Sequence, residues 1–135
     1  MQTFLPYPDF QKSVACLDSK RLGKQRVEAY QILTTLTTGR KAWANHPATL
    51  MWRGYEDALK LYMNATITEW VFRGFNNSMM IADVKAALLP PWFGNEELHA
   101  SHRANLLRKD KNWYGRFGWT EDPELPYIWP VRKAS

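Results

Sequence analysis

The feature that most limits the possible folds of this chain is the spacing of a set of mainly apolar side chains after Pro47. They recur at intervals of three and four residues, at Met51, Tyr55, Ala58, Leu59, Tyr62, Thr66 and Trp70. This period places them on one face of an α-helix, whereas a half-buried strand would alternate. Pro47 suits a first helical turn and Gly74 suits a left-handed helix end. We therefore expect one long amphipathic helix from Pro47 to Gly74.

Capping residues delimit the other helices that we expect. Asp9 can cap a short helix that ends near Leu17, and Asp18 can cap a long helix that runs to Gly39. Asn95 can cap a third long helix, which is acidic at its start and basic at its end. We expect residues 1–8 to be extended and residues 75–94 to form an irregular connection. The predicted fold class is all-α: a compact bundle of three main helices with an extended N-terminus and an irregular, aromatic-rich C-terminal tail from residue 112 onward.

Length and composition set modest bounds on the organisation of the chain. With 135 residues and 45% hydrophobic content, it can bury one core, so we expect a single domain over residues 1–135. The only cysteine, Cys16, excludes an intramolecular disulfide framework. No apolar run approaches the ~20 residues of a membrane span, and the N-terminus does not resemble a secretory signal. We expect a cytoplasmic monomer with no membrane partner.

The charge pattern indicates a polyanionic partner. Lys and Arg number 18 against 13 Asp and Glu, which gives a net charge of +5. In the stretch "KRLGKQRVE" at residues 20–28, helical spacing gathers Arg21, Lys24, Gln25 and Glu28 on one face. Cations, an amide and one carboxylate suit a phosphodiester beside a reacting sugar, although a charged outer helix surface would also explain them. Arg26 falls on the packed side of this helix, where its guanidinium needs a partner.

The histidines and the remaining basic residues form a second group of candidates. His99, His102 and Arg103 share one face of the third long helix, and His46 precedes Pro47. Three histidines can hold a metal ion, but no cluster of acids or cysteines supports them, so we expect no metal site. We expect them instead to contact DNA in the same cleft as Glu28. Lys109 and Arg116 lie among aromatic residues near the C-terminus, a mixture that suits a nucleic-acid backbone and an unstacked base.

Several of these segments resemble the phage pyrimidine-dimer DNA glycosylase and abasic-site lyase family, which has relatives in phage and bacterial genomes. The likeness runs through "RV" at residues 26–27, "YEDALKLYMNATITEWVFRGFN" at residues 55–76, "HASHRANLLRK" at residues 99–109 and "WYGRFG" at residues 113–118. The segments "MQTFLPYPDF", "LDSKRLGKQRVE", "NHPATLMWRGYE" and "PPW" look like a divergent branch of the same family.

The resemblance implies a fold and a chemistry. Family members are compact bundles of three helices with the N-terminus threaded between helices. They act in base excision repair by binding double-stranded DNA and flipping a nucleotide out of the stack, without a metal or organic cofactor. The N-terminal α-amine attacks the sugar C1′, the base leaves, and the Schiff base allows strand cleavage by β-elimination, which is the lyase step.

Two positions of this chain depart from that pattern. Gln2 is too bulky for ordinary removal of Met1, and Thr3 looks most like the family's terminal threonine. The family's catalytic glutamate falls on Gly23 when the chains are aligned at residues 26–27. Glu28 is then the only acid left on this helix beyond its cap. The resemblance therefore leaves the nucleophile open between Met1 and Thr3, and we take Glu28 as the general acid or base.

The function that we favour is a DNA glycosylase, with or without abasic-site lyase activity, that acts on a damaged or modified base in duplex DNA. Two alternatives stay open. One is a reader of damaged or modified DNA that does not cut it, and the other is an enzyme for another modified nucleotide or N-glycosidic bond.

Overall fold

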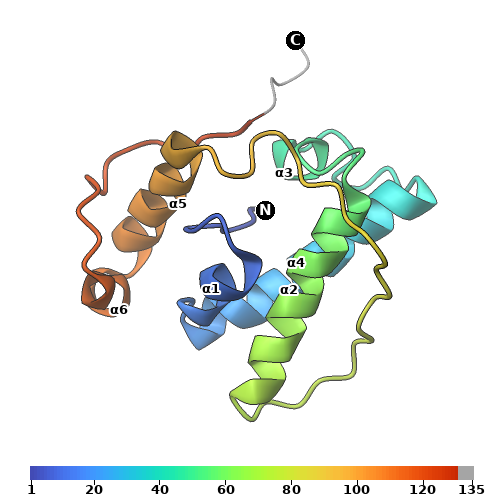
Figure 1. Ribbon diagram of the computed structural model, residues 1–135, viewed down its shortest axis with the longest axis horizontal. Helices are drawn as coiled ribbons and strands as arrows, with labels where there is room; N and C mark the ends of the chain where they lie inside the picture. The colour runs from blue at the N-terminus through green and yellow to red at the C-terminus, as the bar shows by residue number, and fades with distance from the viewer. Residues whose placement is uncertain (131–135) are drawn as a thin grey trace.

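The structure, a computed structural model, describes residues 1–130, and within that range every regular element is helical and no strand occurs (Figure 1). This confirms the all-α class. The elements are α1 (Phe10–Ala15), α2 (Ser19–Thr38), α3 (Pro47–Leu50), α4 (Glu56–Phe72), α5 (Glu96–Lys109), α6 (Lys111–Tyr114) and the short 3₁₀ helix η1 (Gly115–Phe117). None of the helices in residues 1–130 is long and apolar enough to span a bilayer.

The expected capping residues start three of the helices. Asp9 accepts a hydrogen bond from the Lys12 amide at 2.7 Å at the start of α1, and the Asp18 side chain caps α2 in the same way. Asn95 accepts from the Leu98 amide at 3.1 Å at the start of α5. Gly39 ends α2 in the left-handed region with a φ of 73°. These sequence-based boundaries are confirmed because each depends on contacts within a single turn of chain.

The expected single helix from Pro47 to Gly74 is wrong. The chain leaves helical geometry after α3 and passes through Gly54, whose φ of 86° lies in the left-handed region, before α4 begins. This turn keeps Met51 and Trp52 buried, and the Trp52 indole donates to Thr3 Oγ1 at 3.2 Å. A continuous helix would have carried these side chains in another direction, so their burial beside the N-terminus accounts for the break.

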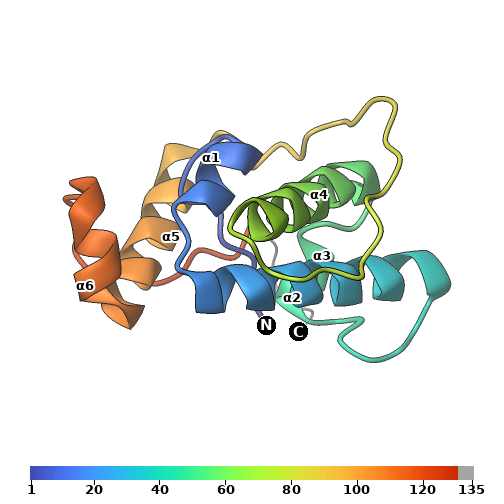
Figure 2. The same cartoon turned by 90° about the horizontal axis from the view of Figure 1, so that it is seen from below.

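The first nine residues, here called the N-terminal segment, run through the middle of the molecule. Figure 1 shows them between α5 on one side and α2 and α4 on the other. α2 and α4 pack directly against each other, whereas α5, among the described elements, packs chiefly on α6 and on this segment. The view in Figure 2 also places α5 and α6 to one side of α2 and α4. An extended stretch of chain therefore occupies the space that direct contact between all three long helices would fill.

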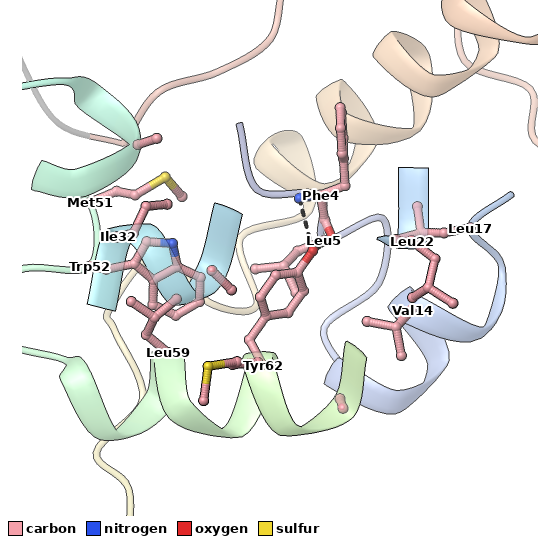
Figure 3. Packing of buried hydrophobic residues seen from close by; sticks show 14 of the residues in the cluster. Phe4, Leu5, Val14, Leu17, Leu22, Ile32, Met51, Trp52, Leu59 and Tyr62 are labelled. Carbon is pink, nitrogen blue, oxygen red and sulfur yellow. Dashed lines mark hydrogen bonds between the residues drawn. The ribbon is translucent and has the colours of Figure 1, made fainter. Parts of the chain in front are cut away.

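The hydrophobic core gathers around the N-terminal segment. Phe4 and Leu5 are buried among side chains from α1, α2 and α4 (Figure 3). The Tyr62 ring stacks on Trp52, with ring centroids 6.0 Å apart, and the Tyr62 hydroxyl accepts a hydrogen bond from the Phe4 amide at 3.2 Å (Figure 3). A buried tyrosine needs such a partner for its hydroxyl. This contact fixes the extended segment against α4.

The C-terminal region is partly helical where an irregular tail was expected, because α6 and η1 occupy residues 111–117. Its aromatic residues do cover helix surfaces. The Trp113 indole donates to the Cys16 carbonyl at 2.8 Å, and the Tyr127 ring stacks on His102 with centroids 4.3 Å apart. The Tyr114 hydroxyl donates to the carboxylate of Asp18, the residue that caps α2. These contacts join both ends of the described chain.

Candidate active site

A pocket that encloses about 210 Å³ opens between the N-terminal segment, α2 and the end of α5. The structure thus brings the polar face of α2 together with the start of the chain. Below, "the pocket" means this cavity, which is lined by Met1, Gln2, Phe4, Lys20, Arg21, Lys24, Gln25, Glu28 and Lys109.

Glu28 presents the only carboxylate among the residues that line the pocket. The residue is 8% exposed, and its Oε2 atom accepts hydrogen bonds from the Gln2 amide at 3.4 Å and from Gln25 Nε2 at 3.2 Å. Lys24 Nζ lies 3.9 Å from the other carboxylate oxygen. A carboxylate held by donors on one side and open to a pocket on the other can take or give a proton.

Gln25 holds the N-terminal segment in place and does not point a free amide at the pocket. Its Oε1 atom accepts from the Phe4 amide at 3.0 Å and from the Tyr62 hydroxyl at 2.5 Å. Its Nε2 atom donates to the Gln2 carbonyl at 2.8 Å as well as to Glu28. Oε1 therefore serves two donors and Nε2 two acceptors, and the side chain is 1% exposed. Gln25 positions the wall that carries Met1 and Gln2.

Four cationic side chains line the same pocket, and two of them have a carboxylate nearby: Arg21 lies 3.1 Å from Asp18, and Lys24 lies 3.9 Å from Glu28. Lys20, Arg21 and Lys24 lie in the first two turns of α2, at the positive end of the helix dipole, where cations are disfavoured. Lys109, the last residue of α5, adds a fourth. Burial lowers the pKa of the Lys109 amine, and the nearby charges of Arg21, Lys24 and Arg108 lower it further. Such a cluster attracts an anion such as a phosphate.

Thr3 lies in the core, away from the pocket. It is fully buried: its hydroxyl accepts from the Trp52 indole, and its carbonyl accepts from the Tyr127 hydroxyl at 2.5 Å. Met1, in contrast, lines the pocket two residues earlier. The geometry therefore favours Met1 over Thr3 as the residue of the N-terminal segment that can meet a ligand.

Gly23 faces α4 and not the pocket. A Cβ atom built on it would lie 2.8 Å from Cζ3 of Trp70, whose ring packs across α2 at this point. A glutamate at position 23 would have to displace that ring. The alignment that places the family's catalytic glutamate on Gly23 therefore does not match the geometry of this chain, in which Glu28 is the acid at the pocket.

The expectation that His99, His102 and Arg103 line the cleft with Glu28 is wrong, because all three are buried elsewhere. His102 Nδ1 accepts from the Leu5 amide at 2.9 Å, and His99 Nδ1 lies 2.7 Å from the Leu5 carbonyl. These rings hold the N-terminal segment against α5. Burial and the neighbouring His99 lower the pKa of His102 to about 3, so the ring is neutral.

Arg103 ties α5 to the C-terminal region and to the N-terminal segment. Its guanidinium lies 2.8 Å from a Glu121 carboxylate oxygen and 2.5 Å from Glu96, and it donates to the Pro6 carbonyl at 2.8 Å. The ion pair with Glu121 could not be predicted from the sequence, because Glu121 is 18 residues away and lies in a segment expected to be irregular.

Three further candidates also lie outside the residues that line the pocket. Arg26 donates to Asn77 Oδ1 at 2.7 Å and its guanidinium lies 5.0 Å from the Trp70 ring, so it secures the chain after α4. His46 caps α3 by accepting from the Ala48 amide at 3.0 Å. Arg116 is exposed and its guanidinium covers the Trp113 ring at 3.9 Å.

A comparison with models of protein families identifies the family of this chain. A family model described as "Pyrimidine dimer DNA glycosylase" matches residues 1–83, more than half of the chain. The chain belongs to the pyrimidine dimer DNA glycosylase family. Its members are DNA-binding glycosylases of DNA repair, which makes DNA the substrate class of this protein. No curated protein and no solved structure matches the chain.

The part of the chain that matches the pyrimidine dimer DNA glycosylase family contains most of the pocket. Residues 1–83 span the N-terminal segment and helices α1 to α4, so every lining residue except Lys109 lies within the match. Sequence reasoning missed Lys20 as a lining residue and Tyr62 as a support for Gln25. Lys20 adjoins the predicted polar face and could have been included. Tyr62 belonged to an apolar stripe, which gave no sign that its hydroxyl would be used.

Proposed function

We propose that the pocket receives the sugar of a nucleotide flipped out of duplex DNA, and that the protein first releases the damaged base and then cleaves the abasic strand. The observation that carries the proposal is the meeting of the Glu28 carboxylate, the N-terminal residue Met1 and four cationic side chains at one small cavity. Attack on C1′ that forms a covalent intermediate needs a nucleophile beside a proton acceptor, and this arrangement supplies both.

The size of the pocket supports a sugar as its occupant. Sites for drug-sized ligands enclose ~300–1,000 Å³, whereas this one encloses about 210 Å³. That space suits one deoxyribose with its phosphate better than two linked pyrimidines. The target nucleotide must leave the stack to reach it, because the reacting C1′ is covered inside the duplex.

We assign a role to each group at the pocket. An amine forms a bond to C1′ while the base leaves with the bonding electrons, and Glu28 accepts the proton that the attached amine loses. Arg21, Lys20 and Lys24 hold the flanking phosphates. Gln25 is a positioning residue, because its hydrogen bonds to the backbone of Gln2 and Phe4 hold the N-terminal segment at the pocket. We further propose that residues 1–135 act as one domain and as a monomer, because walls of the pocket come from both halves of the chain.

The test is release of base from a duplex that contains a single pyrimidine dimer, together with strand cleavage at an abasic site. We expect both activities in the unaltered protein, and we expect Glu28→Gln to reduce them by about 10²–10⁴-fold. Glutamine keeps an acceptor for the Gln2 amide, so the N-terminal segment should stay in place. The exposed Glu124 provides a matched control, since Glu124→Gln removes one carboxylate in the C-terminal region.

The alternatives give different results in the same assay. Tight binding to the lesion without base release or cleavage would identify a reader of damaged DNA. Release of base from free nucleotides in preference to duplex would identify an enzyme for another N-glycosidic bond. Equal activity of Glu28→Gln and the unaltered protein would refute the role of Glu28.

A further inference from the structure

Lys109 forms the wall of the pocket opposite α2. It is the last residue of α5, its side chain is exposed, and it lines the same cavity as Glu28 and Met1. The other cationic side chains in the pocket belong to α2, so Lys109 is the one that comes from a separate helix. A lysine that lines a cavity from the end of a helix can meet a ligand there.

Desolvation and the charges around Lys109 lower the pKa of its amine. Arg21 and Lys24 on α2 and Arg108 on α5 are the nearby cations, and Glu28 is the nearby acid. Among residues 1–130, no carboxylate lies within 4.0 Å of Lys109 Nζ to stabilise the ammonium form. Partial desolvation and these cations lower its pKa, which increases the fraction of amine with a free electron pair near neutral pH. Lysines beside other cations serve as Schiff-base nucleophiles for this reason.

We propose that Nζ of Lys109 is the nucleophile that forms the imine with C1′ of the abasic sugar in this pocket. The inference rests on the proposed lyase function and names the amine that performs it. The α-amine of Met1 is the competing candidate, because Met1 lines the same cavity.

The steps balance without any oxidant or reductant. The neutral amine adds its electron pair to the aldehyde carbon C1′ of the ring-opened sugar, and the adduct takes up one proton from water and loses a water molecule to give a protonated imine. The imine draws electrons from C2′, the C2′ proton passes to the Glu28 carboxylate, and the C3′–O bond breaks with its electrons on the departing phosphate. Water then hydrolyses the imine and returns the amine of Lys109.

The decisive experiment is borohydride trapping followed by peptide mapping. The full-length protein is incubated with a duplex that carries one abasic site, the imine is reduced to a stable amine, and the digested adduct is located by mass spectrometry. We expect the added sugar on Lys109. An adduct only on the α-amine of Met1 would overturn this inference while leaving the proposed function intact. The absence of any adduct would refute the lyase function itself, and this inference with it.

Variants separate the nucleophile from its charge. We expect Lys109→Gln and Lys109→Arg each to reduce adduct formation by at least about 100-fold. Lys109→Arg keeps the positive charge and should retain DNA affinity close to that of the unaltered protein, because arginine stays protonated and can still pair with phosphate. Lys85→Gln is the control for loss of one exposed lysine outside the pocket and should trap normally.

The Lys109 variants must be shown to fold before their trapping is compared. Lys109 is exposed, so its replacement should not unfold the protein, which a thermal melt can check. Normal trapping by Lys109→Arg would show that the side chain acts only as a cation and would overturn the assignment.

Discussion

Gly23 shows how one missing side chain determines the contact between α2 and α4. The Trp70 ring lies where a Cβ atom would be, stacks on Phe75 with centroids 4.3 Å apart, and donates from its indole to the Asn76 carbonyl at 2.8 Å. The ring is therefore held on two sides and cannot move aside at little cost. The glycine serves helix packing, and the acid of the site comes from another position on the same helix.

We expect Gly23→Ala to lower the free energy of unfolding by about 1 kcal/mol. Strain from overpacking costs ~1–3 kcal/mol, which exceeds the ~1 kcal/mol that alanine gains over glycine inside a helix. Gly115 is the matched control, because a Cβ atom there meets nothing within 4 Å and its φ of −64° suits alanine. Chemical denaturation measures both variants. Stabilisation by Gly23→Ala would contradict the close approach of Trp70.

His102 makes the stability of the protein depend on pH. Its pKa is about 3 in the folded protein and near 6.5 when unfolded, so the unfolded chain binds more protons between these values. Stability should be complete above pH 6.5 and should fall as the pH drops toward 3. From pH 6.5 to pH 5 we expect this residue alone to cost about 2 kcal/mol.

Denaturant unfolding at pH 5, 6 and 7 tests this dependence. His102→Gln should unfold more easily at pH 7, because it disturbs the contact with the Leu5 amide, but its stability should change less with pH. A slope as steep as that of the unaltered protein would show that other groups cause the pH dependence.

At the scale of elements, α5 is held by polar contacts more than by direct packing on the other long helices. Arg103 supplies several of these contacts through Glu121, Glu96 and the Pro6 carbonyl. We expect Arg103→Met to lower the free energy of unfolding by about 3 kcal/mol, because it leaves the Glu121 carboxylate half-buried without its partner. The double variant Arg103→Met/Glu121→Gln should recover part of this loss.

The same variant separates a structural role from contact with DNA. A residue that neutralises a phosphate makes the affinity for DNA depend more steeply on salt. Since the Arg103 guanidinium is already paired, we expect the salt dependence of duplex binding to be unchanged in folded Arg103→Met. A flatter dependence, with stability unchanged, would place Arg103 at the DNA after all.

Elements were predictable from the sequence where local contacts define them. The caps at Asp9, Asp18 and Asn95 act within one turn, so the starts of three helices could be found from residue types alone. The break at Gly54 could not, because it depends on burying Trp52 against Thr3, far away in the chain. A regular apolar period is compatible with one helix or with two, and the contact between Trp52 and Thr3 determines which of them forms.

The candidate site was also predictable only where local spacing defines it. The face of α2 that carries Arg21, Lys24 and Glu28 follows from helical spacing, and the structure brings it to the pocket. The position of His99 and His102 did not follow from their spacing, which defines a helix face but not the element that the face meets. In this fold that element is the backbone of Leu5.

Across the whole molecule, the pocket depends on the path of the N-terminal segment. Gln25 from α2, Tyr62 from α4 and His102 from α5 each accept a hydrogen bond from the backbone of Phe4 or Leu5. These bonds fix the start of the chain, with Met1 and Gln2, at the pocket. Lys109 at the end of α5 completes the cavity. The side chains that we propose to react are thus carried by helices around one extended stretch, which is the arrangement that precise covalent chemistry needs.

The most direct test of this account is a crystal structure of the protein joined by borohydride to an abasic duplex. The account predicts that the reduced sugar lies in the pocket, with C1′ bonded to an amine there and C2′ within hydrogen-bonding reach of the Glu28 carboxylate. A sugar bound at any other surface, with the cavity between α2 and the N-terminal segment empty, would contradict it.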